Sequence, residues 1–133
     1  QKANQLDVDQ ANIMEMELRS VLADMNGKKD EAESWLKKAV ELESNISYSY
    51  GPPPVVKPSF EMYGEWLLKN ERPQEALAQF DYSLKRAPNR VLSLKGKLSA
   101  ARHLGDINME SELMLELKKI LHLADNKPTL SEI

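Results

Sequence analysis

The sequence predicts an all-α protein built from stacked helical hairpins. Leu, Ala, Glu and Lys dominate the composition and aromatic residues make up only 6% of it, a bias that favours helix over sheet. Apolar residues recur at helical spacing in six segments, and Gly or Pro breaks separate these segments. The length of 133 residues suits one domain of ordinary size.

The first hairpin is expected from helices at about 5–25 and 29–44, separated by a break at Asn26 and Gly27. The first helix has a run of apolar residues at helical spacing: Ile13, Met14, Leu18, Val21, Leu22 and Met25. The second helix has Ala32, Leu36, Ala39, Val40 and Leu42. Each helix therefore offers one apolar face to a neighbour.

Residues 58–87 predict the second hairpin, with a break at 70–72. Pro73 fits the first position of a helix, because the N–H that proline lacks has no intrahelical partner there. That helix is expected to end at Ala87, since the residue before Pro88 is pushed out of the α region.

The third hairpin is expected to begin with Asn89 as the cap of a helix that runs to about Leu104. Gly105 is expected to end that helix in the left-handed conformation, and Asp106 to cap the last helix. The apolar face predicted for the last helix consists of Ile107, Leu113, Leu117, Ile120 and Leu121.

Residues 45–58 depart from the helical pattern, because Pro52, Pro53, Pro54 and Pro58 force extended or polyproline II backbone. We expect an insertion whose tyrosines and valines pack against the hairpins. The alternative is a proline-rich ligand for an aromatic groove. The polar tail, 125–133, is expected to be extended or partly disordered.

The second hairpin resembles the tetratricopeptide repeat, which has a period of 34 residues. Residues 57–90 carry its pattern of large and small positions: Phe60, Tyr63, Gly64, Leu67, Ala76, Phe80, Ser83 and Pro88. Residues 13–46 and 91–124 are similar, although Leu98 and Glu110 replace small residues, which suggests a more open third hairpin. The resemblance implies an α-solenoid, a right-handed superhelical stack of about three hairpins in a single domain, 1–133.

A narrower resemblance is to the C-terminal part of long, poorly characterised bacterial tetratricopeptide proteins, which are similar in having a proline-rich break before their final hairpins. The matching segments are 50–59, 61–65, 87–90 and 123–125. Phe60 stands where that family has a histidine. This resemblance implies that the chain is the end of a longer solenoid.

The composition excludes several classes of function. A net charge of −3 would not draw the chain to nucleic acid, and no apolar run is long enough to insert in a membrane. No cysteine, HExxH or Gly-rich phosphate loop is present, so we predict no catalytic residue, metal or cofactor. Glu61, Glu65 and His103 could form a metal site, but we expect them to lie on a solvated face and to form ion pairs between helices. Trp35 and Trp66 are expected in the core.

The resemblance implies that the first helix of each hairpin lines a concave groove that binds a protein or peptide. The predicted groove residues are Glu17, Val21, Asp24, Glu61, Glu65, Leu68, Lys95, Ser99, Arg102 and His103. Glu17 and Val21 stand where chaperone-binding members have the Lys and Asn of a carboxylate clamp, so that partner class is rejected.

Two features of this groove leave alternatives open. Its acidic first half and basic second half could neutralise each other, with Glu65 pairing Lys95 or Arg102. Alternatively, they could orient a peptide that carries both positive and negative charges. The alternative to peptide binding is a structural end cap or a self-association module, which would form a homo-oligomer. An exposed face at Leu113, Leu117 and Leu121 would favour self-association.

Overall fold

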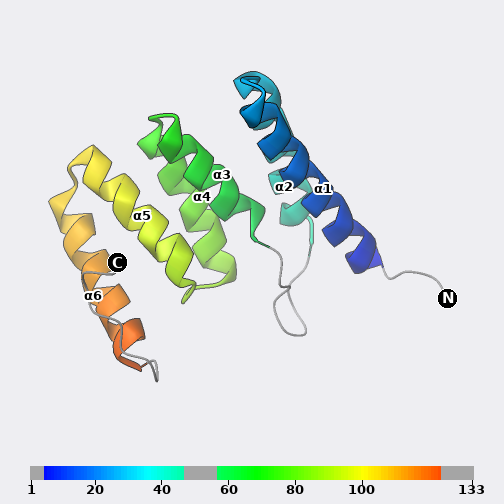
Figure 1. Cartoon of the computed structure of the whole chain (residues 1–133). Helices are drawn as coiled ribbons and strands as arrows, with labels where there is room; N and C mark the ends of the chain where they lie inside the picture. Colours follow the sequence, from blue (N-terminus) through cyan, green and yellow to red (C-terminus); the bar gives the residue numbers. More distant parts are fainter. Residues whose placement is uncertain (1–4, 47–56, 124–133) are drawn as a thin grey trace. The chain divides into compact units, whose positions relative to one another are not determined.

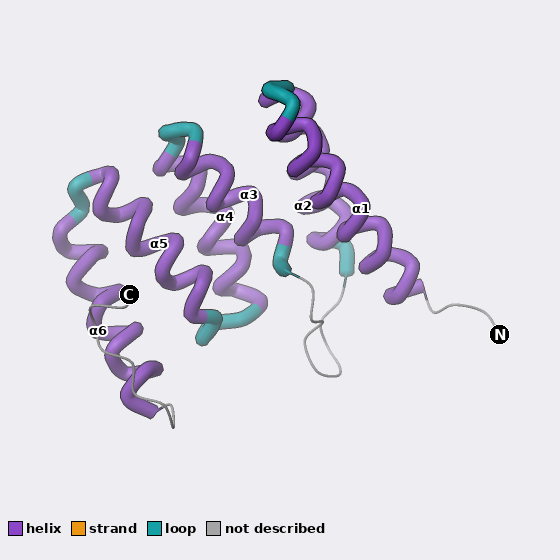
Figure 2. Tube along the Cα trace, in the orientation of Figure 1, coloured by secondary structure: helices purple, strands orange, loops and turns teal. Residues whose placement is uncertain are grey.

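The computed structural model describes residues 5–46 and 57–123, which form six α-helices and no strand (Figure 1; Figure 2). The all-α prediction is therefore confirmed. The helices are α1 (Gln5–Met25), α2 (Lys29–Ser44), α3 (Ser59–Lys69), α4 (Pro73–Arg86), α5 (Val91–Leu104) and α6 (Ile107–Leu123). Most of the predicted proline-rich insertion and the whole of the predicted tail lie outside the described residues.

The chain divides into two compact units, Gln1–Tyr63 and Gly64–Ile133. In the first unit, α1 packs along α2, and small residues line much of the contact. The buried residues of these two helices are Ile13, Glu17, Ser20, Ala23, Ala32, Leu36, Ala39 and Glu43. Because the small side chains occupy the buried side of α1, most of its large apolar residues lie elsewhere on the helix.

Two hydrogen bonds attach the start of α3 to α2. The backbone N–H of Ser59 donates to Glu43 Oε1 at 3.1 Å, and the Tyr63 hydroxyl donates to Glu33 Oε1 at 2.6 Å. Two glutamates of α2, Glu33 and Glu43, therefore both anchor the first part of α3. A bond to a carboxylate is stronger than one between neutral groups, which suits this anchoring role.

In the second unit, Phe80 on α4 is fully buried and lies against a glycine on each neighbouring helix. A Cβ on Gly64 of α3 would come within 2.8 Å of the Phe80 ring, and a Cβ on Gly96 of α5 would overlap the same ring edge. The Ser83 and Ser93 hydroxyls meet at 2.7 Å between α4 and α5. Small residues therefore let α3, α4 and α5 close around one aromatic ring.

The last two helices share a separate apolar cluster. It consists of Leu94, Leu98, Ala101, Leu113 and Leu117. Leu98 therefore serves as core where a small residue was expected. Glu110, the other departure from the repeat pattern, lies at the surface and pairs with Arg102 at 2.8 Å.

The three hairpins are closed by the same turn. In each, a residue within two positions of the end of the first helix has a positive φ: Gly27 (74°), Glu71 (60°) and Gly105 (71°). Its N–H bonds to the carbonyl three residues back, and the next N–H bonds to the carbonyl five residues back, as in a Schellman motif. The next helix begins two residues later each time, at Lys29, Pro73 and Ile107.

Two details differ from the sequence expectations, and a third agrees with them. Asn89 does not cap α5: Arg90 holds the cap position and makes no side-chain hydrogen bond there. Ile107, expected on the apolar face of the last helix, is 74% exposed. The prediction for Asp106 is confirmed, since its Oδ1 accepts the Met109 N–H at 3.0 Å.

The two tryptophans are half-buried rather than in the core. Arg19 and Lys38 lie over the Trp35 ring, at 5.2 and 4.5 Å from its centroid, and Arg72 lies 5.8 Å from the centroid of Trp66. Cations on the ring faces explain how these large side chains remain at the surface.

We predict that Glu71→Gly stabilises the protein. The left-handed conformation costs a non-glycine residue roughly 1–2 kcal/mol, while glycine adds about 0.5–1 kcal/mol of unfolded-state entropy. The free energy of unfolding should therefore rise by about 0.5–1 kcal/mol in a urea titration. The matched control, Gly105→Glu, should lower it by a similar amount. A loss of stability in Glu71→Gly would contradict the strained turn.

We predict that Gly96→Ala destabilises the second unit, although alanine favours helix by about 1 kcal/mol over glycine. Overpacking costs about 1–3 kcal/mol, and Phe80 cannot move away because Gly64 holds the same ring edge. In a Phe80→Leu background the sign should reverse, since the ring is gone. A double-mutant cycle of unfolding free energies measures this coupling, and its absence would show that the ring is not confined.

Candidate ligand-binding site

The predicted groove residues of the first unit divide into exposed and buried ones. Val21 is exposed and Asp24 is half-buried. In contrast, Glu17 is only 7% exposed and Glu61 is fully buried. The acidic groove surface expected from the sequence is therefore not formed by these two carboxylates. They belong to the interior of the unit instead.

The predicted groove residues of the second unit lie on α3 and α5, where Glu65, Arg102 and His103 are exposed. Leu68, Lys95 and Ser99 are half-buried. Arg102 pairs with Glu110 of α6, and His103 Nδ1 lies 2.8 Å from the Ser99 carbonyl of its own helix. These two side chains are therefore held by partners within their own hairpin.

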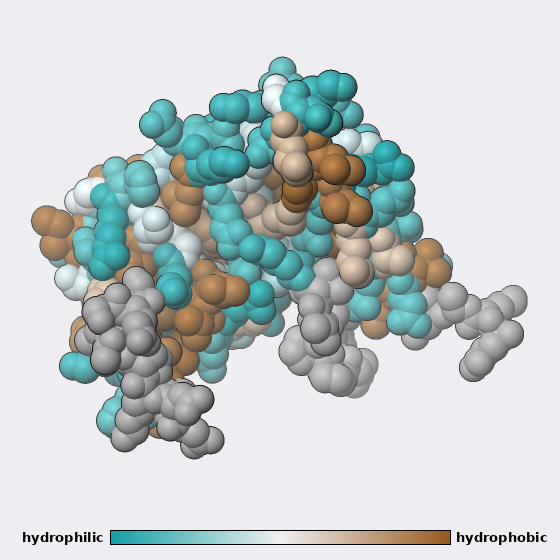
Figure 3. Space-filling view, in the orientation of Figure 1, coloured by the Kyte–Doolittle hydropathy of each residue, from teal (hydrophilic) through white to brown (hydrophobic). Residues whose placement is uncertain are grey.

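Helix α1 exposes most of its large apolar side chains. The exposed ones from residue 14 onward are Met14, Leu18, Val21, Leu22 and Met25. Leu18 is 60% and Met25 is 78% exposed, although both belong to residue types that are usually covered. Figure 3 shows hydrophobic side chains gathered over α1 among hydrophilic ones. This exposed apolar surface is the most distinctive feature of the first unit.

A hollow of about 590 Å³ lies at this surface. It is lined by Met14, Glu15, Glu17, Leu18, Val21, Lys57 and Met62. Apolar side chains make up its walls, Lys57 supplies a cation, and Glu17 supplies an almost buried carboxylate. A ligand site typically combines an apolar lining with a few polar groups that orient the ligand.

The Glu17 carboxylate lies in a cluster of polar groups from three parts of the unit. Glu43 of α2 and Lys57, before α3, act on it electrostatically. Ser59, at the start of α3, is also close to it. Nevertheless, Glu17 Oε2 and Ser59 Oγ are buried without a hydrogen-bond partner. Buried polar atoms of this kind are uncommon, and each costs about 1–3 kcal/mol.

The environment raises the pKa of Glu17 from 4.5 to about 7. Burial is the largest cause, and repulsion from the Glu43 carboxylate adds to it. Lys57 and Ser59 act in the opposite direction and offset only part of the rise in pKa. Glu17 therefore changes its charge near neutral pH, where an ordinary glutamate is fully ionised.

Sequence reasoning placed Glu17 at the site but missed Glu43, Lys57, Ser59 and Met62. One signal was available: Ile13, Glu17 and Ser20 follow the i, i+4, i+7 spacing of a buried helical face. The contribution of Lys57 and Ser59 depends on how the chain returns after residue 46, which no local pattern specifies.

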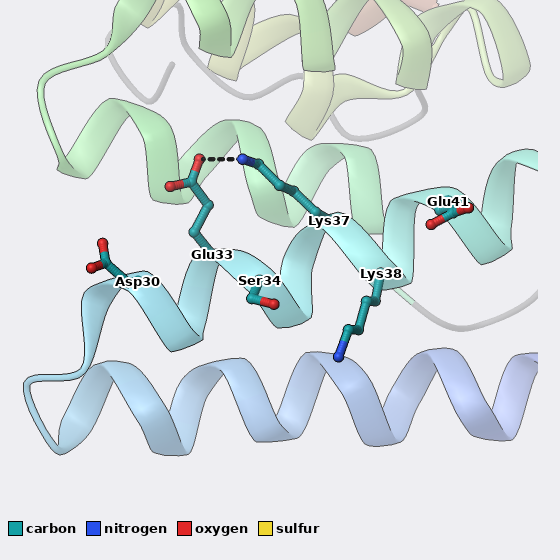
Figure 4. A pocket seen from close by; sticks show the side chains of 6 residues that line it. All are labelled: Asp30, Glu33, Ser34, Lys37, Lys38 and Glu41. Atoms are coloured by element: carbon teal, nitrogen blue, oxygen red, sulfur yellow. Dashed lines mark ion pairs between the residues drawn. The ribbon is translucent and has the colours of Figure 1, made fainter.

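A second hollow, of about 410 Å³, lies on the polar face of α2. It is lined by Asp30, Glu33, Ser34, Lys37, Lys38 and Glu41. Figure 4 shows Lys37 reaching back to Glu33, at 3.6 Å, while Lys38 points to the other side of the helix. Ion pairs four residues apart on an exposed helix are worth only a few tenths of a kcal/mol. This hollow is a solvated helix face.

Other kinds of site find little support in the part of the chain that the structure describes. Within residues 5–46 and 57–123, no group of three His, Asp or Glu side chains could hold a metal ion. No helix in these ranges is long and apolar enough to cross a membrane. No family model matches the chain, and no curated protein matches it.

We predict that Glu17→Gln stabilises the protein at alkaline pH. The folded state binds the Glu17 proton more tightly than the unfolded state, so this carboxyl destabilises folding increasingly as pH rises from about 4.5 to 7. The difference between the pKa of 4.5 and the folded-state pKa of about 7 corresponds to a loss of about 3 kcal/mol in the free energy of unfolding once Glu17 is fully ionised. The variant should therefore gain roughly 1–3 kcal/mol at pH 8, and the gain should shrink toward pH 4.5.

Urea titrations at pH 4.5, 6 and 8 measure this difference in unfolding free energy. Glu15→Gln is the matched control, because it removes an exposed carboxylate from the same helix, and it should change the free energy of unfolding by less than about 1 kcal/mol at each pH. A pH-independent Glu17→Gln difference would contradict the buried acid.

Proposed function

We propose that this chain is a protein-interaction module that binds a peptide or protein partner through the exposed face of its first helix, and that it has no catalytic activity of its own. The observation that supports this proposal most directly is that α1 leaves five large apolar side chains exposed: Met14, Leu18, Val21, Leu22 and Met25. If a partner buries one such side chain completely, the burial contributes about 1.5–3 kcal/mol to the free energy of binding. A partner that covers several of them gains enough to offset the entropy lost on association.

We further propose that the hairpins belong to a tetratricopeptide-type array, a right-handed α-solenoid in which residues 45–58 form an insertion. The equivalent turns support this view, since Glu71 and Gly105 are 34 residues apart and Gly27 and Glu71 are 44 apart. The enclosure of Phe80 by Gly64 and Gly96 also supports it, because repeats of this type pack large residues against small ones.

The competing proposal is an end cap or a self-association module. Its predicted contact face included Leu113 and Leu117, and both are buried in the α5–α6 cluster. That face is therefore already used within the hairpin. A second copy could still cover the apolar surface of α1, so the oligomeric state distinguishes the two proposals.

We predict that Leu22→Glu with Met25→Glu abolishes partner binding. Both side chains are exposed, so stability should change by less than about 0.5 kcal/mol. Placing two charges in an apolar contact should weaken binding at least about 100-fold. The ligands are 16-residue peptides selected from a random display library against the wild-type chain, and binding is measured by fluorescence polarisation.

The matched control is Ile107→Glu with Leu115→Glu, which introduces the same charges at exposed apolar positions of α6. Selected peptides should bind this control as they bind the wild type. Equal loss in both double variants, or no peptide enriched, would contradict the proposal. Sedimentation showing a dimer that only the α1 variant disrupts would favour self-association instead.

A further inference from the structure

The hollow on α1 is lined by a carboxylate with one oxygen atom, Glu17 Oε2, that has no hydrogen-bond partner. Glu17 is only 7% exposed, and its Oε2 atom is buried without a hydrogen-bond partner. A carboxylate can only accept hydrogen bonds, so the group that completes this site must be a donor. Ammonium and guanidinium groups are the strongest donors to a carboxylate.

The charges around the hollow favour a cation over an anion. Glu15 and Glu17 line it, and Glu43 acts on Glu17 from α2, although Glu15 also pairs with Arg19 at 2.9 Å. The one cation among the groups that line the hollow is Lys57. A second carboxylate placed here would be repelled by most of these groups, while a basic group would be attracted.

The apolar walls fit the stem of a basic side chain. Arg and Lys bury their methylene groups on apolar surface while the charged head reaches a polar partner. Met14, Leu18, Val21 and Met62 supply that surface. The two methionines are flexible, so they can move to admit a head group to the covered carboxylate.

We propose that this hollow binds an arginine or lysine side chain of a partner peptide, with its stem against Met14, Leu18 and Met62 and its charged head at Glu17. The inference rests on the proposed function and specifies the ligand chemistry of one part of the same surface. The apolar contacts supply affinity, and the Glu17 contact selects a basic residue over an apolar or acidic one.

The test uses the full chain with ¹³C-methyl methionine, observed by NMR at pH 8, where Glu17 is ionised. Three probes are titrated: acetyl-Leu-Arg-Leu-amide and the same tripeptide with norleucine or Glu in the middle. Met14 and Met62 report on the hollow, and Met109 of the second unit is the internal control. The Arg probe should shift both Met14 and Met62 and bind about tenfold more tightly than the other two probes.

Variants separate the contribution of Glu17 from that of the apolar walls. Glu17→Gln should remove the preference for the Arg probe and leave the weak norleucine binding unchanged. Glu15→Gln, at the rim, should weaken Arg binding by less than about threefold. Lys57→Met should strengthen it, because a competing cation is removed. At pH 5.5, Arg binding should fall by about tenfold or more as Glu17 becomes protonated.

Three results would overturn the inference: equal binding of the Arg and norleucine probes, tighter binding of the Glu probe, or an unchanged Arg preference in Glu17→Gln. Failure of the broader proposal is distinguishable. If library-selected peptides shift Met25 but the Arg probe leaves Met14 and Met62 unmoved, the interaction function stands and this inference fails.

Discussion

Helices in both units pack through small residues, and this requirement decides where the large apolar side chains lie. In α2, Ala32 and Ala39 are fully buried, and in the second unit two glycines enclose the Phe80 ring. Small residues let helix backbones approach closely, and a few large side chains then fill the remaining space. On α1, Ser20 and Ala23 occupy part of the buried side, together with Ile13 and Glu17, and most of the large apolar side chains lie on the exposed side.

The helices and their breaks could be predicted because each boundary has a local cause. Glycine at 27 and 105 and proline at 73 and 88 act within one or two residues, so their positions alone specify the turns. The turn at Glu71 uses the same geometry without glycine, and only its backbone bonds reveal the equivalence. The cap of α5 was misassigned because a residue such as Asn89 favours a cap but does not fix which residue occupies it.

The candidate site was less predictable, because burial depends on contacts between distant segments. Spacing placed Glu17 on the predicted groove face of α1, while the structure covers it with groups from α2 and from the segment that begins α3. Ser59 lies 42 residues beyond Glu17 in the sequence. Its approach also depends on the bond from its N–H to Glu43, which no periodicity encodes. Sequence reasoning therefore singled out Glu17 but gave no indication of its surroundings or of its pKa.

A buried acid at this place is hard to explain by folding alone. Small proteins are stable by only about 5–15 kcal/mol, so a cost of about 3 kcal/mol above pH 7 is a large share of the total. This cost already includes the favourable contributions of Lys57 and Ser59, which lower the pKa of Glu17. On our proposal, a bound cation would complete the hydrogen bonding of Glu17 and offset its repulsion from Glu43. The same ligand would then stabilise the fold by mass action, so binding and folding would be linked through one carboxylate.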